Sequence, residues 1–121
     1  MEEFINKVTC SDALRFLKKL PDSSIDLLIT DPPYGIGFMG KDWDKALPDK
    51  KVWVECLRVL RDGAFAFVMS IPRADCLSRM IINLEDVGFK VNFTPIFWAY
   101  ACLSSDTEVL TRDGWRDWER L

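Results

Sequence analysis

The chain has 121 residues, of which 49% are hydrophobic and 12% aromatic, and its net charge is −3. This length and composition predict one packed domain, or part of one, and exclude a disordered chain. The longest apolar runs are far shorter than the about 18 residues of a membrane-spanning helix, and the opening MEEF lacks the basic residues of a signal peptide. We therefore expect a cytoplasmic protein with no membrane partner.

Two residue types restrict the chemistry. The sequence contains no histidine, which excludes Ser-His and Cys-His catalysis by this chain alone and most zinc sites. The four cysteines, Cys10, Cys56, Cys76 and Cys102, form no C-x-x-C pair, so they predict neither a metal site nor a disulfide framework. We interpret the first three as small buried thiols.

The N-terminal part of the chain contains two candidate strands around a short helix. Residues 4–10 can form a short strand, and Ser11 or Asp12 is a suitable N-cap for a helix over residues 13–20. Residues 25–29 are too few for a helix and are soon followed by two prolines. They predict a strand that is buried on both faces.

A loop and a helix come next. Residues 35–48 contain three glycines and no sustained periodicity, which predicts a loop. The apolar residues that follow recur at the spacing of one helix face: Trp53, Cys56, Leu57 and Leu60. Asp62 and Gly63 then form a stop signal, at which we expect this helix to end.

The next segments repeat the alternation of strand and helix. Residues 64–70 predict a second buried strand. The helical spacing recurs at Leu77, Met80, Ile81 and Leu84. Pro72 and Gly88 bound this second helix, and residues 89–100 predict a third extended segment, in which Pro95 indicates an edge position or a bulge. The alternation predicts an α/β fold with right-handed βαβ units and a mostly parallel sheet with helices on both faces.

The tetrapeptide Asp31-Pro32-Pro33-Tyr34 follows the strand predicted at residues 25–29. Ligands of open α/β sheets bind beyond the carboxyl ends of the strands, which makes this position a candidate site. The Asp31 carboxylate and the Pro32 carbonyl can each accept one N–H of an exocyclic amino group on a nucleobase, which turns the nitrogen lone pair toward an electrophile. The two prolines restrict φ and supply no competing N–H, and Tyr34 offers a flat face to an extruded base. The alternative is a loop that merely ends a strand.

Three stretches around this motif resemble a known family. They are CSDALRFLKKLPDSSIDLLITDPPYGIG, ECLRVLRDGAFAFVMS and GFKVNFTPIFWAYA. They resemble the DNA amino-methyltransferases that use S-adenosylmethionine to methylate N6 of adenine or N4 of cytosine, and the resemblance covers nearly all of residues 5–101. It implies part of the doubly wound, mostly parallel methyltransferase sheet.

The resemblance also implies roles for individual residues. Asp31 and the Pro32 carbonyl would hold the target amino group, and Tyr34 would pack on the flipped base. Asp31 favours adenine, because N4-cytosine members more often have a serine there. Asp12 and Asp31 would approach the cofactor, although N-capping explains Asp12 equally well.

Two parts of this family are missing from the sequence. The F-x-G-x-G turn that binds the cofactor's methionine end is absent, and Gly35-x-Gly37 leads into no helix. The target-recognition region is absent as well. We therefore expect residues 1–101 to be the N-terminal part of a catalytic domain that is inactive alone and needs a further part to bind the cofactor and double-stranded DNA.

Residues 102–121 resemble something else, the first block of inteins, which have the Hint fold. The matched positions are Cys102, Leu103, Asp106, Thr107, Val109, Thr111 and Gly114. The resemblance implies a short β-type start of a second domain, in which Cys102 attacks the carbonyl of Ala101 and converts the peptide bond to a thioester. Inteins of this type usually use histidines, so we expect a truncated or split intein that needs its complementary half. The alternative is a free cysteine that opens a hairpin of the methyltransferase itself.

Three hypotheses about function follow from these observations. The first is the N-terminal fragment of a site-specific DNA amino-methyltransferase, interrupted by an intein that begins at Cys102. The second is a partner-binding module, one half of a trans-splicing precursor. The third is a methyltransferase that acts on RNA or on a protein amide.

Overall fold

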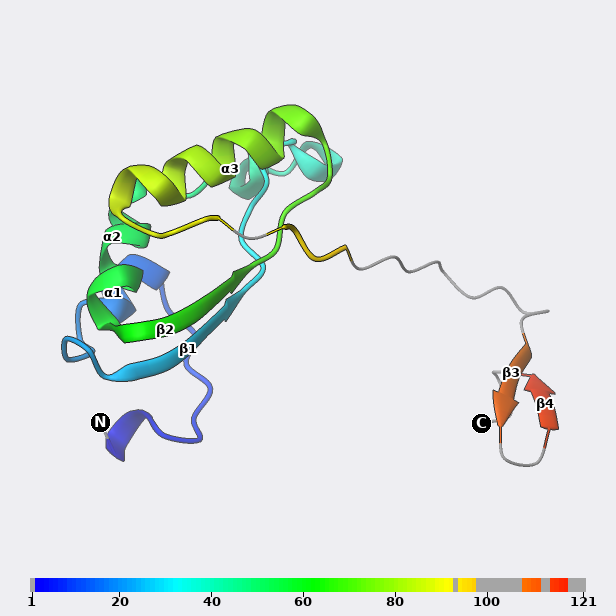
Figure 1. The fold of residues 1–121 in the computed structure, drawn as a ribbon, viewed down its shortest axis with the longest axis horizontal. Coiled ribbons are helices and arrows are strands. Elements are labelled where there is room, and N and C mark those ends of the chain that lie inside the picture. Colours follow the sequence, from blue (N-terminus) through cyan, green and yellow to red (C-terminus); the bar gives the residue numbers. More distant parts are fainter. Residues whose placement is uncertain (1, 93, 98–107, 112–113, 118–121) are drawn as a thin grey trace.

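The computed structural model describes residues 2–92, 94–97, 108–111 and 114–117. These residues form three α-helices and four strands, together with short 3₁₀ helices (Figure 1). In chain order the elements are the 3₁₀ helix Glu2–Phe4, helix α1 (Ala13–Leu17), strand β1 (Ile25–Thr30), the 3₁₀ helices Phe38–Gly40 and Asp42–Asp44, helix α2 (Lys50–Val59), strand β2 (Leu60–Val68), helix α3 (Ala74–Val87), and strands β3 (Glu108–Thr111) and β4 (Gly114–Asp117).

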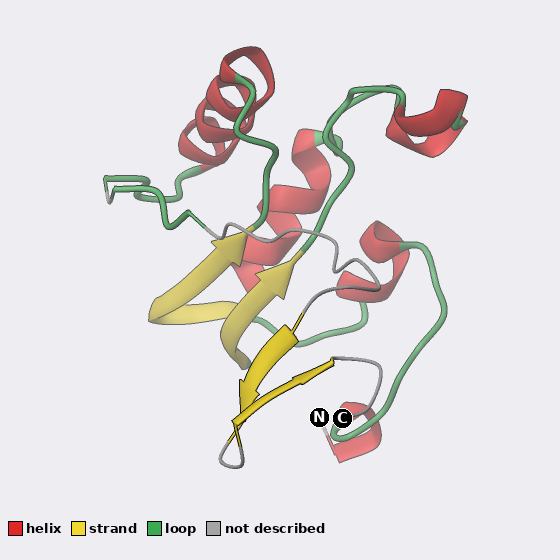
Figure 2. Ribbon diagram, turned by 90° about the vertical axis from the view of Figure 1, so that its right-hand side faces the viewer, coloured by secondary structure: helices red, strands yellow, loops and turns green. Residues whose placement is uncertain are grey.

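Strands β1 and β2 form a parallel pair, and helix α2 lies between them in the chain. The two arrows point the same way in Figure 2. Leu27 pairs with Phe65 and Ile29 pairs with Phe67. This arrangement confirms the predicted α/β class and the parallel pairing. The larger, doubly wound sheet stays a prediction.

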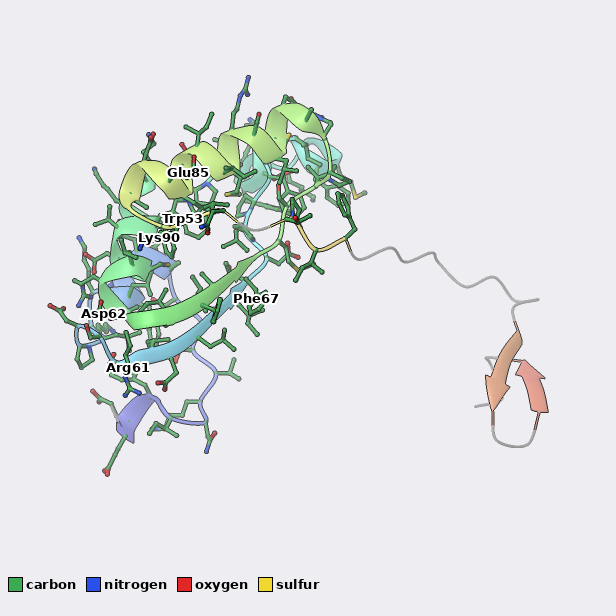
Figure 3. The ribbon with its side chains drawn as sticks, in the orientation of Figure 1. Trp53, Arg61, Asp62, Phe67, Glu85 and Lys90 are labelled. Atoms are coloured by element: carbon green, nitrogen blue, oxygen red, sulfur yellow. The ribbon has the colours of Figure 1, made fainter. Side chains whose placement is uncertain are left out.

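The hydrophobic core lies on one side of this sheet, where the helices pack (Figure 1). Trp53 is 1% exposed and lies beneath α3 (Figure 3), where it packs with the other buried core residues Cys56, Met80 and Leu84. From β1 only Leu28 packs against this cluster. The core is therefore built from the helix faces that the periodicity predicts.

The other face of the sheet is exposed. On β1, Leu27 and Ile29 are 47% and 69% exposed, and on β2, Phe65 and Phe67 are 60% and 48% exposed. The prediction that β1 is buried on both faces is wrong for the described residues. Parallel strands usually have continuous apolar sequences because both faces of their sheet are covered. The helices described here cover only one face of the sheet.

Two further segments predicted to be extended form no strand in their described residues. Residues 4–10 contain the end of a 3₁₀ helix and then irregular chain, in which Val8 is fully exposed. The described part of residues 89–100 forms no strand. Phe89 and Val91 pack against the core, but Ile96 and Phe97, which follow Pro95, are exposed. Proline lacks the N–H that a sheet ladder needs.

The boundaries of the helices are set by local signals. The Asp12 carboxylate accepts the Arg15 N–H at 2.9 Å, so Asp12 is the N-cap of α1, as predicted. Gly88 ends α3 at a φ of 111°, also as predicted. Helix α2 ends at Val59, before the expected stop at Asp62 and Gly63, because these two residues lie within β2 at an irregularity in its pairing with β1.

Strands β3 and β4 form an antiparallel hairpin in which Thr111 pairs with Gly114. The hairpin falls inside residues 102–121, for which a β-type start of a second domain is predicted. A single hairpin occurs in many folds and identifies none of them. The boundary between 101 and 102 lies outside the described residues, so the division of the chain stays a prediction.

None of the helices in the described part of the chain combines the length and the apolar character needed to cross a membrane.

The core predicts a specific loss of stability for one substitution. Met80 is 2% exposed and belongs to the buried cluster between α2 and α3. We expect Met80→Ala to lower the free energy of unfolding by about 2–5 kcal/mol, because it leaves a cavity that the neighbouring side chains fill only in part. Urea titration followed by circular dichroism measures the free energy of unfolding.

The neighbouring Arg79→Ala, on the exposed side of the same helix, serves as the control. It is expected to change the free energy of unfolding by less than about 0.5 kcal/mol. Equal effects of the two substitutions would contradict the described core.

Candidate active site at the end of strand β1

The tetrapeptide at residues 31–34 lies directly at the carboxyl end of β1, which stops at Thr30. The Met69 N–H, just past the end of β2, donates to the Thr30 carbonyl at 2.9 Å, so the two strands end side by side. Asp31 is exposed, and the three residues after it are half-buried. The position matches the prediction, since ligands of parallel sheets bind at this end of the strands.

Asp31 and Tyr34 contact each other directly. The Tyr34 hydroxyl donates a hydrogen bond to Oδ1 of Asp31. Because each carboxylate oxygen accepts more than one hydrogen bond, Oδ2 and part of the capacity of Oδ1 remain for a ligand. The sequence did not predict this contact, which ties the ring of Tyr34 to the proposed acceptor.

Asp44 is a part of the site that sequence reasoning missed. It lies at the far end of the glycine loop and is only 1% exposed. Its Oδ1 accepts the N–H groups of Tyr34 at 2.7 Å and Gly35 at 3.0 Å, and its Oδ2 accepts the Phe38 N–H at 2.9 Å. The Asp44 carbonyl also accepts the Gly37 N–H at 2.7 Å. One residue therefore holds the backbone of the chain that follows the two prolines.

The charge of this buried carboxylate is stabilised by backbone dipoles. Burial by itself raises the pKa of Asp44, because it disfavours the ionised form. Hydrogen bonds from the backbone N–H groups of Phe38, Tyr34, Gly35 and Ile36 outweigh burial and hold the pKa below its usual value. Asp44 is therefore ionised at neutral pH.

The loop that Asp44 holds contains a glycine at a position where another residue would be strained. Gly35 has a φ of 74°, and a Cβ placed there would lie 3.3 Å from the backbone N of Leu47. Three large apolar side chains of this loop are exposed: Phe38, Met39 and Trp43 are 53%, 80% and 62% exposed. The loop thus turns the Asp44 carboxylate inward and these three apolar side chains outward.

The remaining predicted site residues lie elsewhere or are not described. The Asp12 carboxylate caps α1, and its approach to a cofactor stays a prediction. Ala101 and Cys102 lie outside the described residues. Cys56 and Cys76 are buried as predicted, and burial raises the pKa of Cys56 to about 11, so this thiol is inert. The prediction for Cys10 is wrong, because this residue lies in the irregular N-terminal chain and is exposed.

Other features of the described residues lie away from residues 31–44. Among the described residues, one hollow lies between α1 and α2 and another lies beside the start of β1, and neither is lined by the tetrapeptide. Within the described ranges, no three Cys, Asp or Glu side chains gather closely enough to hold a metal ion.

Comparison with known proteins finds similarity to methyltransferases. The chain is 42% identical over 105 residues to the type II methyltransferase M.HpaI of Haemophilus parainfluenzae, a match that covers 78% of this chain and 32% of that protein. It is 31% identical over 103 residues to the DNA adenine methyltransferase YhdJ of Escherichia coli (strain K12), covering 74% of this chain and 31% of that protein. It is 30% identical over 80 residues to the type II methyltransferase M.BamHI of Bacillus amyloliquefaciens, covering 57% of this chain and 18% of that protein.

No family model matches the chain, and no solved structure matches it. The aligned segments span at most about a third of the length of these three relatives. Over most of its length, this chain is therefore similar to one segment of type II and adenine-specific DNA methyltransferases, the enzymes that its D-P-P-Y region also resembles.

Proposed function

We propose that this chain is the catalytic segment of a DNA amino-methyltransferase that transfers a methyl group from S-adenosylmethionine to an exocyclic amino group of a flipped base, with N6 of adenine favoured over N4 of cytosine. The observation that carries the proposal is the Asp31 carboxylate. It is exposed at the carboxyl end of a parallel sheet, bonded to Tyr34 and followed by a loop that a buried carboxylate holds. The similarity to DNA methyltransferases supports it.

The residues of the tetrapeptide have separate tasks in this reaction. Asp31 accepts one N–H of the amino group through the capacity that Tyr34 leaves unused, and the Pro32 carbonyl accepts the other. These two bonds favour a tetrahedral nitrogen, whose lone pair is then available for bonding. The ring of Tyr34 supports the base by stacking, because the base has lost its neighbours in the duplex. When bound, S-adenosylmethionine supplies a methyl group on a positively charged sulfur.

The exposed carboxylate at the strand ends fits a cationic methyl donor. The net charge of −3 does not favour binding to DNA, which is itself negatively charged. The contacts to the phosphate backbone must therefore come from other parts of the enzyme. We place there the F-x-G-x-G turn and the target-recognition region, and we expect the fragment alone to be inactive. We further propose that the enzyme acts in the cytoplasm.

A transfer assay tests this function. The methyltransferase of which this chain forms part is incubated with S-adenosylmethionine carrying a labelled methyl group and with double-stranded DNA, and the labelled nucleoside is identified. We expect N6-methyladenine. Label on RNA or on protein amides in place of DNA would support the third hypothesis and refute this one.

Tyr34→Phe separates the two roles of this side chain. It keeps the ring that stacks on the base and removes the hydroxyl that donates to Asp31. We expect kcat to fall by roughly tenfold, because Asp31 is then less well oriented. A factor of this size corresponds to the net free energy of one hydrogen bond. Tyr34→Ala removes the stacking surface too and should lower kcat further. If the two variants lose the same activity, the ring has no role of its own.

We also propose that residues 102–121 begin an intein. The resemblance of the C-L-x-x-D-T-x-V block supports this, and the hairpin of β3 and β4 is compatible with it. In this proposal Cys102 attacks the Ala101 carbonyl, and the rest of the intein is supplied by further chain or by a complementary half. If a separate complementary half supplies the rest, this chain acts as a partner-binding module until the two chains are ligated.

A further inference from the structure

Asp44 combines features that a surface loop does not require. It is 1% exposed, yet its side chain holds three backbone N–H groups up to ten residues away. Aspartate is almost never fully buried unless its charge is compensated. The compensation here comes from the chain that directly follows the two prolines, so the two ends of the loop are joined through one carboxylate.

Apolar contact with the core cluster anchors this loop at Leu47, but three large apolar side chains nearer to Asp44 are not buried. Phe38, Met39 and Trp43 all point largely into solvent, while the acidic side chain lies inside. Apolar residues stabilise a loop by leaving water, which these do not do. Before Leu47, the shape of the loop therefore depends largely on the hydrogen bonds of Asp44 and on the turn at Gly35, where a side chain would be strained.

The Tyr34 backbone links this buried carboxylate to the site. Pro32 and Pro33 have no N–H, so the Tyr34 N–H is the first backbone donor after Asp31, and it is bound by Asp44 at 2.7 Å. The hydroxyl of the same residue donates to Asp31. Asp44 thus holds the backbone of Tyr34, and Tyr34 in turn holds the proposed acceptor of the amino group.

We propose that Asp44 is the positioning residue of the methyl-transfer site: it sets the direction of the chain after Pro33, and through Tyr34 it sets the orientation of the Asp31 carboxylate. Asp44 touches neither the base nor the methyl donor in this proposal. The inference rests on the proposed function, because it assigns Asp44 a task in that reaction. Its effect is on geometry, to which transfer rates are sensitive.

Asp44→Asn tests the proposal in the methyltransferase of which this chain forms part. Asparagine keeps the size of the side chain but replaces one acceptor oxygen by an NH₂ group, which faces a backbone N–H and cannot accept it. We expect kcat to fall roughly 100-fold, the effect of a misplacement of about 1 Å. The KM for S-adenosylmethionine should stay unchanged. The amides of Tyr34, Gly35 and Phe38 should exchange hydrogen faster than in the unmodified protein, while those of α3 should not.

Asp42→Asn is the matched control. Asp42 belongs to the same loop, but it is exposed and pairs with Lys45, so its substitution should leave kcat and the amide exchange unchanged. If Asp44→Asn is as active as Asp42→Asn, the role of Asp44 is refuted while the proposed function stands. If the unmodified enzyme transfers no methyl group to DNA, the proposed function fails, and with it the task assigned to Asp44.

A second variant decides the matter if Asp44→Asn does not fold. Gly35→Ala leaves Asp44 intact but adds a Cβ that lies 3.3 Å from the Leu47 backbone N, at a φ of 74° that alanine rarely adopts. It should displace the same backbone and lower kcat with little effect on the KM for S-adenosylmethionine. Full kcat in Gly35→Ala would overturn the proposal.

Discussion

Asp31→Ala is expected to remove nearly all methyl transfer to DNA while binding of S-adenosylmethionine stays largely intact. The substitution removes the carboxylate that accepts an N–H of the target amino group, and the Pro32 carbonyl alone cannot hold both hydrogens. Loss of one positioned group of this kind lowers kcat by about 10²- to 10³-fold. The contact from the Tyr34 hydroxyl is lost as well, so we expect the upper end of this range. Single-turnover transfer of labelled methyl groups measures the effect.

Asp26→Ala provides the matched control on the same strand. Asp26 lies near the amino end of β1, where its carboxylate is exposed and pairs with Arg61. This change removes one negative charge, as Asp31→Ala does, but at the end of the strand that faces away from the site. Transfer should then proceed at nearly the unmodified rate. A rate near that of the unmodified enzyme in Asp31→Ala would refute the role assigned to Asp31.

Cys102→Ala is expected to leave the precursor unspliced in the presence of the missing part of the intein. Alanine has no nucleophile to attack the Ala101 carbonyl, so the thioester that begins splicing cannot form. Gel electrophoresis with mass spectrometry shows the outcome as a precursor band without ligated product. Because no thioester forms, added thiol should also fail to cleave the chain after Ala101, whereas it should cleave the unmodified precursor.

Cys10→Ala is the control for the loss of a thiol. Cys10 is an exposed cysteine of the same chain, far in sequence from the proposed junction. Its substitution should leave splicing unchanged. Normal ligation in Cys102→Ala would sink the intein proposal and leave the alternative, a cysteine that opens a hairpin of the methyltransferase.

The predictions that succeeded depend on signals that lie close together in the chain. The cap at Asp12, the faces of α2 and α3, and the stop at Gly88 each depend on residues within a few turns of a helix. The position of Asp31 at the end of a strand was found in the same way, because Asp31 follows an apolar run and two prolines come after it. Such patterns reflect local backbone geometry and the period of burial, both of which can be read from the sequence.

The predictions that failed concern which element lies beside which. Val8 belongs to a segment with strand-like composition, but no strand is described beside it. Ile29 belongs to a run that suits a doubly covered strand, yet it is 69% exposed, because the described helices cover the opposite face. Asp62 and Gly63 carry the signal of a helix stop but lie at an irregularity of a strand. The composition of a segment cannot decide between these outcomes, since each depends on contacts with residues that are distant in the sequence.

By itself, the sequence determined the α/β class, the apolar faces of α2 and α3, and the position of the tetrapeptide that begins with Asp31 at the end of a strand. Only the tertiary structure decided how that tetrapeptide is held. Asp44 looked like one more charged residue in a polar loop, and its partners are backbone N–H groups, which every residue except proline possesses. A carboxylate that binds backbone leaves no pattern in the sequence, so its role became visible only when the loop was folded around it.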